Sequence, residues 1–274
     1  MLFQCGRFQL DLSQPRVMGI VNVTPDSFSD GGKFNSTEKA IEHALKLVAD
    51  GADILDIGGE STRPGATPVP LDEELSRVIP VIEGLRDAGV PLSIDTYKPE
   101  VMRAAIAAGA DIINDVCALR EPHALEIVAA SQAGVCLMHM QGRPQTMQAD
   151  PQYDDVVKEV KDFLAERLAA AQQAGIDRAR IVLDPGFGFG KRTAHNLTLL
   201  NHLNDIQSLG LPLLIGLSRK SVLGQVVGSN VDERLHASIA ASVVSVMKGA
   251  NIVRVHDVKP TVDALKIVKA VLGN

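Results

Sequence analysis

The sequence predicts an α/β protein of the (β/α)8 TIM barrel class, formed as a single domain by residues 1–274. The first observation behind this prediction is that short apolar runs alternate with longer amphipathic stretches along the whole chain. Both a closed barrel and an open doubly wound parallel sheet fit such an alternation. The second observation is the count of eight apolar runs in 274 residues, which favours the barrel.

The apolar runs are rich in Val, Ile and Leu, as expected of parallel strands buried on both faces. The predicted strands, in chain order, are Val17–Val23, Ile54–Ile57, Pro91–Ile94, Asp111–Asn114, Gly134–Met138, Arg180–Leu183, Pro212–Ile215 and Asn251–Val255. Between and after them, apolar residues recur with the spacing of an amphipathic helix. The clearest predicted helices are Thr37–Ala49, Asp72–Ala88, Pro99–Ala107, Tyr153–Ala174, Ala194–Leu209, Asp232–Lys248 and Thr261–Val271.

A repeated string supports the same architecture. GADILDI begins at Gly51, GADIINDV at Gly109 and GANIVRV at Gly249. In each, a glycine is expected to end a helix shortly before an apolar strand begins. The spacings between these strings suit whole numbers of βα units of about 30–35 residues each.

Composition narrows the classes of function. Aromatic residues make up only 3% of the chain against 46% for all hydrophobic residues, so the core is expected to consist of Ala, Val, Ile and Leu. The net charge of −6, with no basic stripe, argues against a nucleic-acid partner. The three cysteines, Cys5, Cys117 and Cys136, form neither a disulfide framework nor a CxxC metal pattern.

The chain shows no signals for secretion or membrane insertion. Its first residues, MLFQCGRFQLDL, lack a basic segment followed by a continuous apolar run. No run reaches the roughly 18 apolar residues that a spanning helix needs. We therefore expect a cytoplasmic protein without a membrane partner.

Polar residues lie in the last positions of the predicted strands or follow them, at the end where barrel enzymes carry their active sites. They are Asn22, Asp56, Glu60, Asp95, Asn114, Asp115, His139, Asp184, Ser218, Arg219, Lys220, Arg254 and His256. Chance would scatter such residues between the two ends of the strands. A shared site at the carboxyl ends is the simplest explanation.

Asp95, Asn114 and Asp184 come from three different predicted strands. Their carboxylates accept hydrogen bonds, and the amide both donates and accepts. The set fits a flat heterocycle with a donor-rich edge, such as the aminopyrimidinone edge of a pterin or guanine. The alternative is that these side chains satisfy backbone groups in loops, as Asp and Asn often do.

Arg63, Arg254 and His256 are candidates for binding an anion. The latter two lie at the end of the last predicted strand, where barrels often hold a phosphate near a helix N-terminus, and Asp257 is a plausible cap for the next helix. The segment DPGFGFGK, Asp184–Lys191, matches neither a Walker loop nor a dinucleotide fingerprint, because Arg192 follows Lys191 and Lys191 replaces the third glycine. Its glycines are expected to allow close approach of the backbone and Phe189 to a ligand. For His139 a structural or supporting role is favoured.

Eight motifs occur in an order that resembles the dihydropteroate synthases: NVTPDSFSDGG, DIGGESTRPGA, SIDTYKPEV, INDV, LMHMQG, DPGFGFGK, GLSRKS and VRVHD. The resemblance covers almost the whole chain, and the first, second and seventh motifs are the most specific. The motifs of the pterin site are shared with a wider group of pterin-binding barrels. Members of the family join hydroxymethyl-dihydropterin pyrophosphate to para-aminobenzoate, releasing pyrophosphate and forming dihydropteroate for folate synthesis.

The resemblance implies roles for particular residues. A pterin site is implied at Asp95, Asn114, Asp184 and Lys220, and a pyrophosphate site at Asn22, Arg63, Arg254 and His256, with Asn22 close to Mg²⁺. A pocket for para-aminobenzoate, which in this family also accepts sulfonamides, is implied at Thr62, Pro64, Phe189, Lys220 and Ser221. Catalytic roles are implied for Arg63, Lys220, Arg254 and His256, and a homodimer with the late helices at its interface is implied.

These roles suggest a mechanism in which positive groups stabilise the departing pyrophosphate. Mg²⁺ is expected as the cofactor, held by few protein ligands, with Asn22 the first and Asp30 a weaker second candidate. The connections Thr24–Gly32 and Gly58–Pro70 are expected to close over pyrophosphate, so that the pterin substrate binds first. The alternatives are a pterin-dependent methyltransferase on the same barrel and a pterin-binding relative without catalysis.

Overall fold

The computed structural model describes residues 1–24, 33–62, 65–142 and 146–272. Eight parallel strands form one sheet in the order β8-β7-β6-β5-β4-β3-β10-β9. They are β3 (Arg16–Asn22), β4 (Ile54–Gly58), β5 (Leu92–Asp95), β6 (Ile112–Asp115), β7 (Gly134–Met138), β8 (Ile181–Asp184), β9 (Leu214–Ile215) and β10 (Ile252–Val255). A parallel bridge between Leu183 and Leu213 joins the two ends of this order, and the predicted barrel is confirmed.

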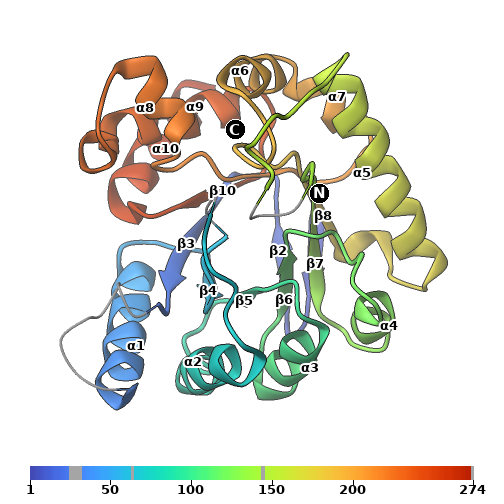
Figure 1. Cartoon of the computed structure of the whole chain (residues 1–274). Coiled ribbons are helices and arrows are strands. Elements are labelled where there is room, and N and C mark those ends of the chain that lie inside the picture. Colours follow the sequence, from blue (N-terminus) through green and yellow to red (C-terminus); the bar gives the residue numbers. More distant parts are fainter. Residues whose placement is uncertain (25–32, 63–64, 143–145, 273–274) are drawn as a thin grey trace.

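Helices surround the strands on all sides (Figure 1). They are α1 (Lys33–Ala49), α2 (Leu71–Gly84), α3 (Pro99–Ala108), α4 (Ala124–Ala129), α5 (Val156–Gln173), α6 (Thr193–Asn201), α7 (Leu203–Gln207), α8 (Ser221–Val227), α9 (Leu235–Met247) and α10 (Val258–Leu272). Their apolar faces and the outer faces of the strands form the largest cluster of buried residues, built mainly from Ala, Val, Ile and Leu. None of the helices in the described ranges is both long and apolar enough to cross a bilayer.

The helix predictions needed several corrections, among them the end of α2, which lies at Gly84 and not at the predicted Ala88. The predicted helix Ala194–Leu209 is two helices, α6 and α7, separated at His202, where Asn201 and His202 favour helix only weakly. The predicted start at Asp232 lies in a 3-10 turn, and α9 begins at Leu235. The short helices α4 and α8 were not predicted, because one or two turns are too short to show helical periodicity.

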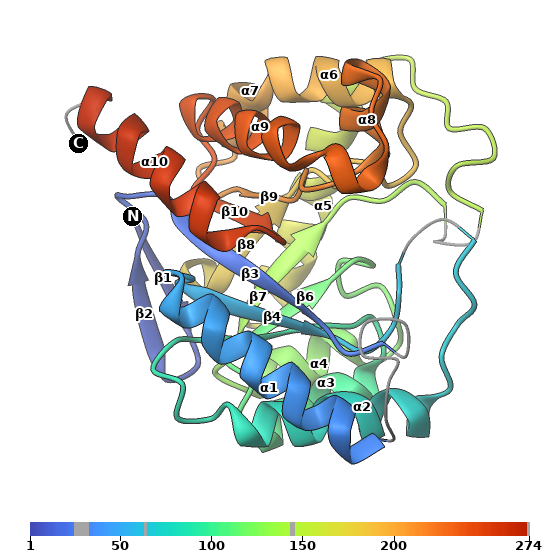
Figure 2. The ribbon, with the colours of Figure 1, turned by 90° about the vertical axis from the view of Figure 1, so that its left-hand side faces the viewer.

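A two-stranded hairpin, not predicted from the sequence, precedes the barrel. Its antiparallel strands are β1 (Leu2–Cys5) and β2 (Phe8–Asp11), and Gly6 in the turn has φ +51°. Figure 2 shows the hairpin at the amino-terminal end of the strands, opposite the end toward which the strands run. The hairpin therefore closes the end of the barrel that lies far from the predicted site.

The inside of the barrel at this end is apolar. Phe3, Cys5 and Leu12 pack against the inward-facing residues of the strands. Those strand residues are Met18, Ile54, Ile112, Cys136, Val182, Leu214 and Ile252. Gly134 leaves the space that the hairpin fills, since a Cβ there would lie 2.6 Å from the ring of Phe3. Any polar pocket in the barrel must therefore lie at the carboxyl end.

Candidate active site

The register of the central strands places several predicted site residues in one row. Asn22 pairs with Gly58, Gly58 with Asp95, and Asp95 with Asn114. Residues paired across parallel neighbours point to the same face, here the inside of the barrel. Gly58 has no side chain, and even a Cβ there would lie 3.5 Å from the Asp95 Cβ. The row therefore leaves room beside Asp95 at the mouth of the barrel.

Arg254 joins two carboxylates in the middle of this mouth. Its Nε donates to Asp56 Oδ2 at 2.5 Å and its Nη2 donates to Asp95 Oδ2 at 2.7 Å. Asn114 Nδ2 also donates to Asp56 Oδ2, at 3.1 Å. A carboxylate can only accept, so this bond fixes the amide with its nitrogen toward Asp56 and its carbonyl oxygen turned away.

Asp56 is the central residue that the sequence did not single out. It is completely buried, two residues before Gly58 on the same strand, so both face the barrel interior. The sequence marked it only as a polar strand end. Its position on the inward face was the available signal, but its link to Arg254 depends on strands at opposite ends of the chain.

Two carboxylates share one guanidinium at this point, and this sets the local electrostatics. Burial raises the pKa of Asp95 to about 7, although Arg254 acts in the opposite direction. Burial by itself would lower the pKa of Arg254, but the charges of Asp56 and Asp95 raise it. Within the described residues, Oδ1 of Asp56 and Oδ1 of Asp95 are buried without a hydrogen-bond partner. Buried polar atoms usually have partners, so these two oxygens mark a place prepared for a donor.

Asp184 and Lys220 form the other side of the mouth. Asp184 Oδ1 accepts from the Gly186 amide at 2.7 Å, and burial raises the pKa of this carboxyl group. Lys220 donates to the Phe187 carbonyl at 2.5 Å and lies 4.7 Å from the centre of the Phe189 ring. Burial lowers the pKa of Lys220 to about 8, partly offset by Asp184. A lysine thus reaches the Asp184 side of the site from the start of α8.

The segment Asp184–Lys191 is held by its own lysine. Lys191 is buried, donates to the carbonyls of Gly186 and Phe189 at 2.8 and 3.1 Å, and lies 2.8 Å from His139 Nδ1. Burial and then Lys191 lower the pKa of His139 to about 2. The buried, neutral imidazole has the supporting place that the sequence favoured. The Lys191 side chain points into the protein, and this agrees with the prediction that the segment is not a phosphate-binding loop.

At Gly186 the backbone lies close to another part of the protein chain. A Cβ on Gly186, which has φ +69°, would lie 1.8 Å from the His139 carbonyl oxygen. Glycine is therefore required here to let two strand ends meet, which differs from the expected approach to a ligand. Phe189, half-buried above Lys220, remains available to a second ligand.

His256 lies at the end of the last strand. Its backbone amide and its Nδ1 lie 3.2 and 3.0 Å from Ser218 Oγ. Asp257 precedes α10 as predicted, but its carboxylate accepts two hydrogen bonds from Arg219, at 2.6 and 3.0 Å. Arg219 is therefore engaged in an ion pair beside the mouth.

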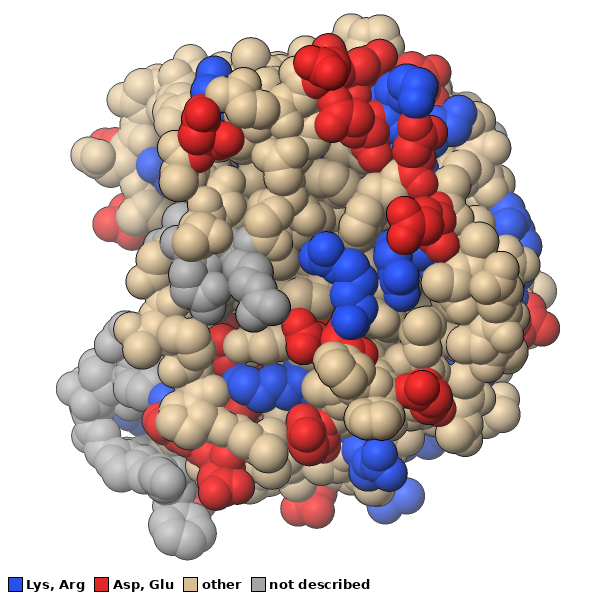
Figure 3. Space-filling model, turned by 45° about the vertical axis from the view of Figure 1, so that its right-hand side comes forward, with Lys and Arg blue, Asp and Glu red and all other residues tan. Residues whose placement is uncertain are grey.

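The remaining predicted site residues differ in burial, and three of them lie outside the described residues. Asn22 and Thr62 are half-buried, and Ser221 is exposed as the first residue of α8. Arg63, Pro64 and Asp30 lie outside the described residues. Among residues that the structure describes, no three His, Cys, Asp or Glu side chains gather as a metal site would require. Side chains of both charges lie interspersed across the face in Figure 3.

The fold and this mouth lined by acidic residues define a pterin-binding barrel. The family described as pterin binding enzyme matches residues 18–256. The dihydropteroate synthase of Escherichia coli K12 is 54% identical over 265 residues, which cover 96% of this chain and 94% of the relative.

Solved structures of dihydropteroate synthases have a fold similar to that of this chain. The Xanthomonas albilineans dihydropteroate synthase with 4-aminobenzoic acid has a TM-score of 0.94 and 56% identity, covering 100% of this chain and 98% of that one. The Yersinia pestis dihydropteroate synthase with a sulfonamide drug complex has a TM-score of 0.95 and 49% identity, with both chains covered completely. The chain belongs to the dihydropteroate synthase family.

Proposed function

We propose that the chain carries out the reaction of its family, the condensation of hydroxymethyl-dihydropterin pyrophosphate with para-aminobenzoate to give dihydropteroate and pyrophosphate. One observation carries the proposal for the site itself. The mouth of the barrel holds buried carboxylate oxygens on Asp56 and Asp95 that lack donors within the described residues. A pterin edge supplies N–H donors of the kind that these oxygens accept.

The pterin is proposed to lie among Asp95, Asn114 and Asp184. Because Asp56 holds the amide nitrogen of Asn114, the end of that amide directed away from Asp56 is the carbonyl oxygen. All three side chains then offer acceptors to the substrate. Lys220 offers a donor opposite them and separates this site from Phe189.

The chemical step breaks the bond between the pterin methylene carbon and a pyrophosphate oxygen, and the electron pair leaves with pyrophosphate. The arylamine nitrogen forms the new bond and loses one proton to solvent, since a neutral arylamine needs no strong base at pH 7. The carboxylates of Asp95 and Asp184 favour positive charge on the ring as the leaving group departs. Arg254, His256 and Arg63 are proposed to stabilise the charge that grows on pyrophosphate.

Mg²⁺ is proposed as the cofactor, with Asn22 supplying one protein oxygen. The donor set fits, because Mg²⁺ prefers oxygen ligands and keeps several waters and substrate oxygens. Asn22 lies in the same strand row as Gly58 and Asp95, at the mouth of the barrel. When bound, the ion neutralises charge on the leaving pyrophosphate. Asn22→Ala is expected to raise the Mg²⁺ concentration needed for half-maximal activity.

The second substrate is proposed to bind on the Phe189 side of Lys220, in a pocket shaped by Thr62, Pro64 and Ser221. The Xanthomonas relative holds 4-aminobenzoic acid and the Yersinia relative a sulfonamide complex, so this chain is proposed to bind both. Lys220 would contact both substrates, because it reaches the Asp184 side of the mouth and lies against the Phe189 ring.

A homodimer through the late helices is also proposed. Val244 and Met247 on α9 and Ile267 and Val271 on α10 are large apolar side chains with 41–78% of their surface exposed. The two helices pack on each other, and these side chains are proposed to belong to one apolar surface that a second copy covers. Sedimentation velocity of the native chain and of Met247→Glu is expected to give dimer and monomer respectively.

The experiment for the main proposal is pyrophosphate release by the purified protein with hydroxymethyl-dihydropterin pyrophosphate and Mg²⁺. Release is expected only when para-aminobenzoate is present, with dihydropteroate formed in equal amount. A folded protein that binds the pterin but releases no pyrophosphate would contradict the synthase function. In that case, methyl transfer from a methylated pterin would be the next activity to measure.

A further inference from the structure

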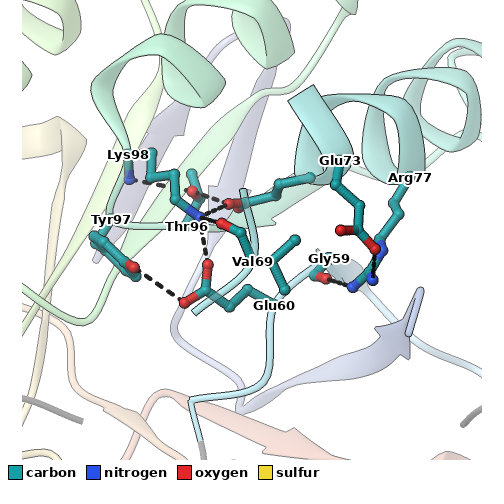
Figure 4. A network of polar contacts seen from close by, with 9 residues as sticks. Gly59, Glu60, Val69, Glu73, Arg77, Thr96, Tyr97 and Lys98 are labelled. Atoms are coloured by element: carbon teal, nitrogen blue, oxygen red, sulfur yellow. Dashed lines mark hydrogen bonds and ion pairs between the residues drawn. The ribbon is translucent and has the colours of Figure 1, made fainter. Parts of the chain in front are cut away.

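A single lysine joins two residues between β4 and α2 to a residue of α2 itself. Lys98 Nζ donates to Glu60, to Glu74 at 2.5 Å and to the backbone carbonyl of Val69 at 2.8 Å (Figure 4). An ammonium group has three N–H donors, and here each has its own acceptor. All three N–H donors of the Lys98 ammonium group therefore bind within the protein.

The three acceptors come from distinct places along the chain. Glu60 lies just after β4, Val69 lies just before α2, and Glu74 lies in the first turns of α2. One ammonium group therefore binds Glu60 and Val69, which are far apart between β4 and α2, and links them to Glu74 in the helix that follows. The carboxylates are well enclosed, with side-chain exposures of 8% for Glu60 and 1% for Glu74.

The residues before Lys98 complete the network. The Tyr97 hydroxyl donates to Glu60 Oε1 at 3.0 Å, and the Thr96 hydroxyl donates to Glu74 Oε1 at 2.7 Å. Each of the four carboxylate oxygens thus accepts one hydrogen bond. A network with every member satisfied is rigid, whereas losing one member leaves buried charge without a partner.

The network is attached directly to the strand that carries Asp95. Asp95 ends β5, and Thr96, Tyr97 and Lys98 are the next three residues before α3 begins at Pro99. The residue before a proline is confined to extended backbone, and Lys98 has φ −85° and ψ 119°. The position of the lysine is therefore fixed relative to the pterin side of the mouth.

We propose that Lys98 is a positioning residue that sets Glu60 and Val69, and with them Thr62 near Glu60 in the chain, at a fixed place relative to Asp95. This inference rests on the proposed function, because Thr62 is assigned there to the pocket for para-aminobenzoate. Lys98 touches neither substrate in this proposal. It acts through Glu60 and Val69, and the second substrate is the one affected.

The test is steady-state kinetics of Lys98→Met with each substrate varied in turn. The KM for para-aminobenzoate is expected to rise by up to about 10²-fold, the loss that misplacement by about 1 Å can cause. The affinity for the pterin substrate, measured separately by calorimetry, is expected to change less than about threefold. A variant with a native KM for para-aminobenzoate would overturn the inference.

A second variant separates positioning from stability. Lys98→Met leaves Glu74 buried without its cation, so the variant is expected to be less stable. Lys98→Met combined with Glu74→Gln removes the more deeply buried of the two unpaired charges and is expected to recover part of the stability while the KM stays high, because Glu60 and Val69 are still not held. Recovery of the KM together with stability would show a merely structural lysine and overturn the inference. If neither variant folds, Glu60→Gln tests the same point by weakening one attachment.

Two controls make the outcomes distinguishable. Lys158→Met removes a lysine whose ion pair with Asp162 lies on the exposed face of α5, and native kinetics are expected. The unmodified enzyme must release pyrophosphate in the presence of para-aminobenzoate. Failure there contradicts the proposed function, whereas an unchanged KM in an active Lys98→Met variant contradicts only the inference about Lys98.

Discussion

The two ends of the barrel each hold an arginine bound to buried aspartate, and the two arrangements differ. At the amino end, Asp111 accepts from the Arg7 amide, Nε and Nη2 and from the Leu92 amide, at 2.9–3.1 Å. Arg7 also donates to the carbonyls of Arg86 and Gly109. At the carboxyl end, Arg254 serves two aspartates, and each keeps one buried oxygen without a partner among the described residues.

This difference indicates that the arginine–aspartate contacts at the amino end contribute to stability, whereas those at the carboxyl end contribute to function. At the amino end both oxygens of Asp111 accept two hydrogen bonds each, and the pair ties the hairpin to the barrel. The cluster at the carboxyl end retains two buried acceptors, Oδ1 of Asp56 and Oδ1 of Asp95, without a donor among the described residues. Functional sites often reduce stability in this way, and the rest of the fold compensates. The amino end should therefore control stability and the carboxyl end activity.

The largest expected effect is on stability, from Phe3→Ala. Phe3 is buried in the apolar cluster under the barrel, and removing a buried Phe costs about 3–5 kcal/mol. Denaturant unfolding is expected to show this loss, with kcat/KM unchanged at temperatures where the variant is folded. A fall in kcat/KM of the folded variant would break the proposed division between the ends.

The next effect comes from a matched pair of substitutions, Asp95→Asn and Asp111→Asn. Asp95→Asn is expected to weaken pterin binding by about 1–3 kcal/mol, because a substrate donor loses its charged acceptor, while stability stays native or rises. Asp111→Asn is expected to cost about 1–3 kcal/mol of unfolding free energy with native pterin affinity. Calorimetric titration and chemical denaturation of both variants measure the two quantities. Equal loss of stability in both would contradict the comparison.

The smallest effect is the pH dependence of pterin affinity. Burial raises the pKa of Asp95 to about 7, so below that pH the group is increasingly a carboxylic acid that accepts poorly. Burial lowers the pKa of Lys220 to about 8, so above that pH the ammonium charge is lost. Affinity is therefore expected to be highest between pH 7 and 8, and to fall about tenfold per unit well below pH 7.

Asp95→Asn serves as the control, since it should remove the acidic limb of that profile and leave the alkaline one. The same raised pKa has a stability consequence of opposite sign. The folded, ligand-free protein binds more protons at Asp95 than the unfolded chain between about pH 4 and pH 7. The contribution of Asp95 to stability therefore falls as pH rises through that window. If the acidic limb of the pH profile of pterin affinity survives in Asp95→Asn, then a group other than Asp95 causes it.

The strands could be predicted from the sequence because each is a local apolar run that ends on a polar residue. Gly134–Met138 was predicted with the observed bounds. The hairpin was missed because its strands are short and carry Gln4 and Gln9 among their apolar residues, although Phe3, Cys5, Phe8 and Leu10 alternate with polar neighbours. A search for alternation around Gly6 would have found it.

The candidate site was predicted only in part, for a related reason. Asp95, Asn114, Asp184 and Arg254 were found because they lie at the ends of strands, and Lys220 because it follows one; their roles remain predictions. Asp56 and Lys98 gain their importance from partners distant in the sequence, such as Arg254 for Asp56. Local patterns do not show which charges meet. Such residues become visible only when the strands are assembled.

The three cysteines lie at both ends of the barrel, and this gives the protein built-in chemical reporters. Cys5 and Cys136 belong to the apolar cluster under the hairpin, and Cys117 packs with Val116, Met138 and Met140 near the mouth. Burial raises the pKa of Cys5 to about 12 and that of Cys136 well above its usual range, and only the thiolate reacts quickly. A thiol-reactive dye should thus label each cysteine only when its own end opens, and the labelling rates would time the two ends separately, without any engineered probe.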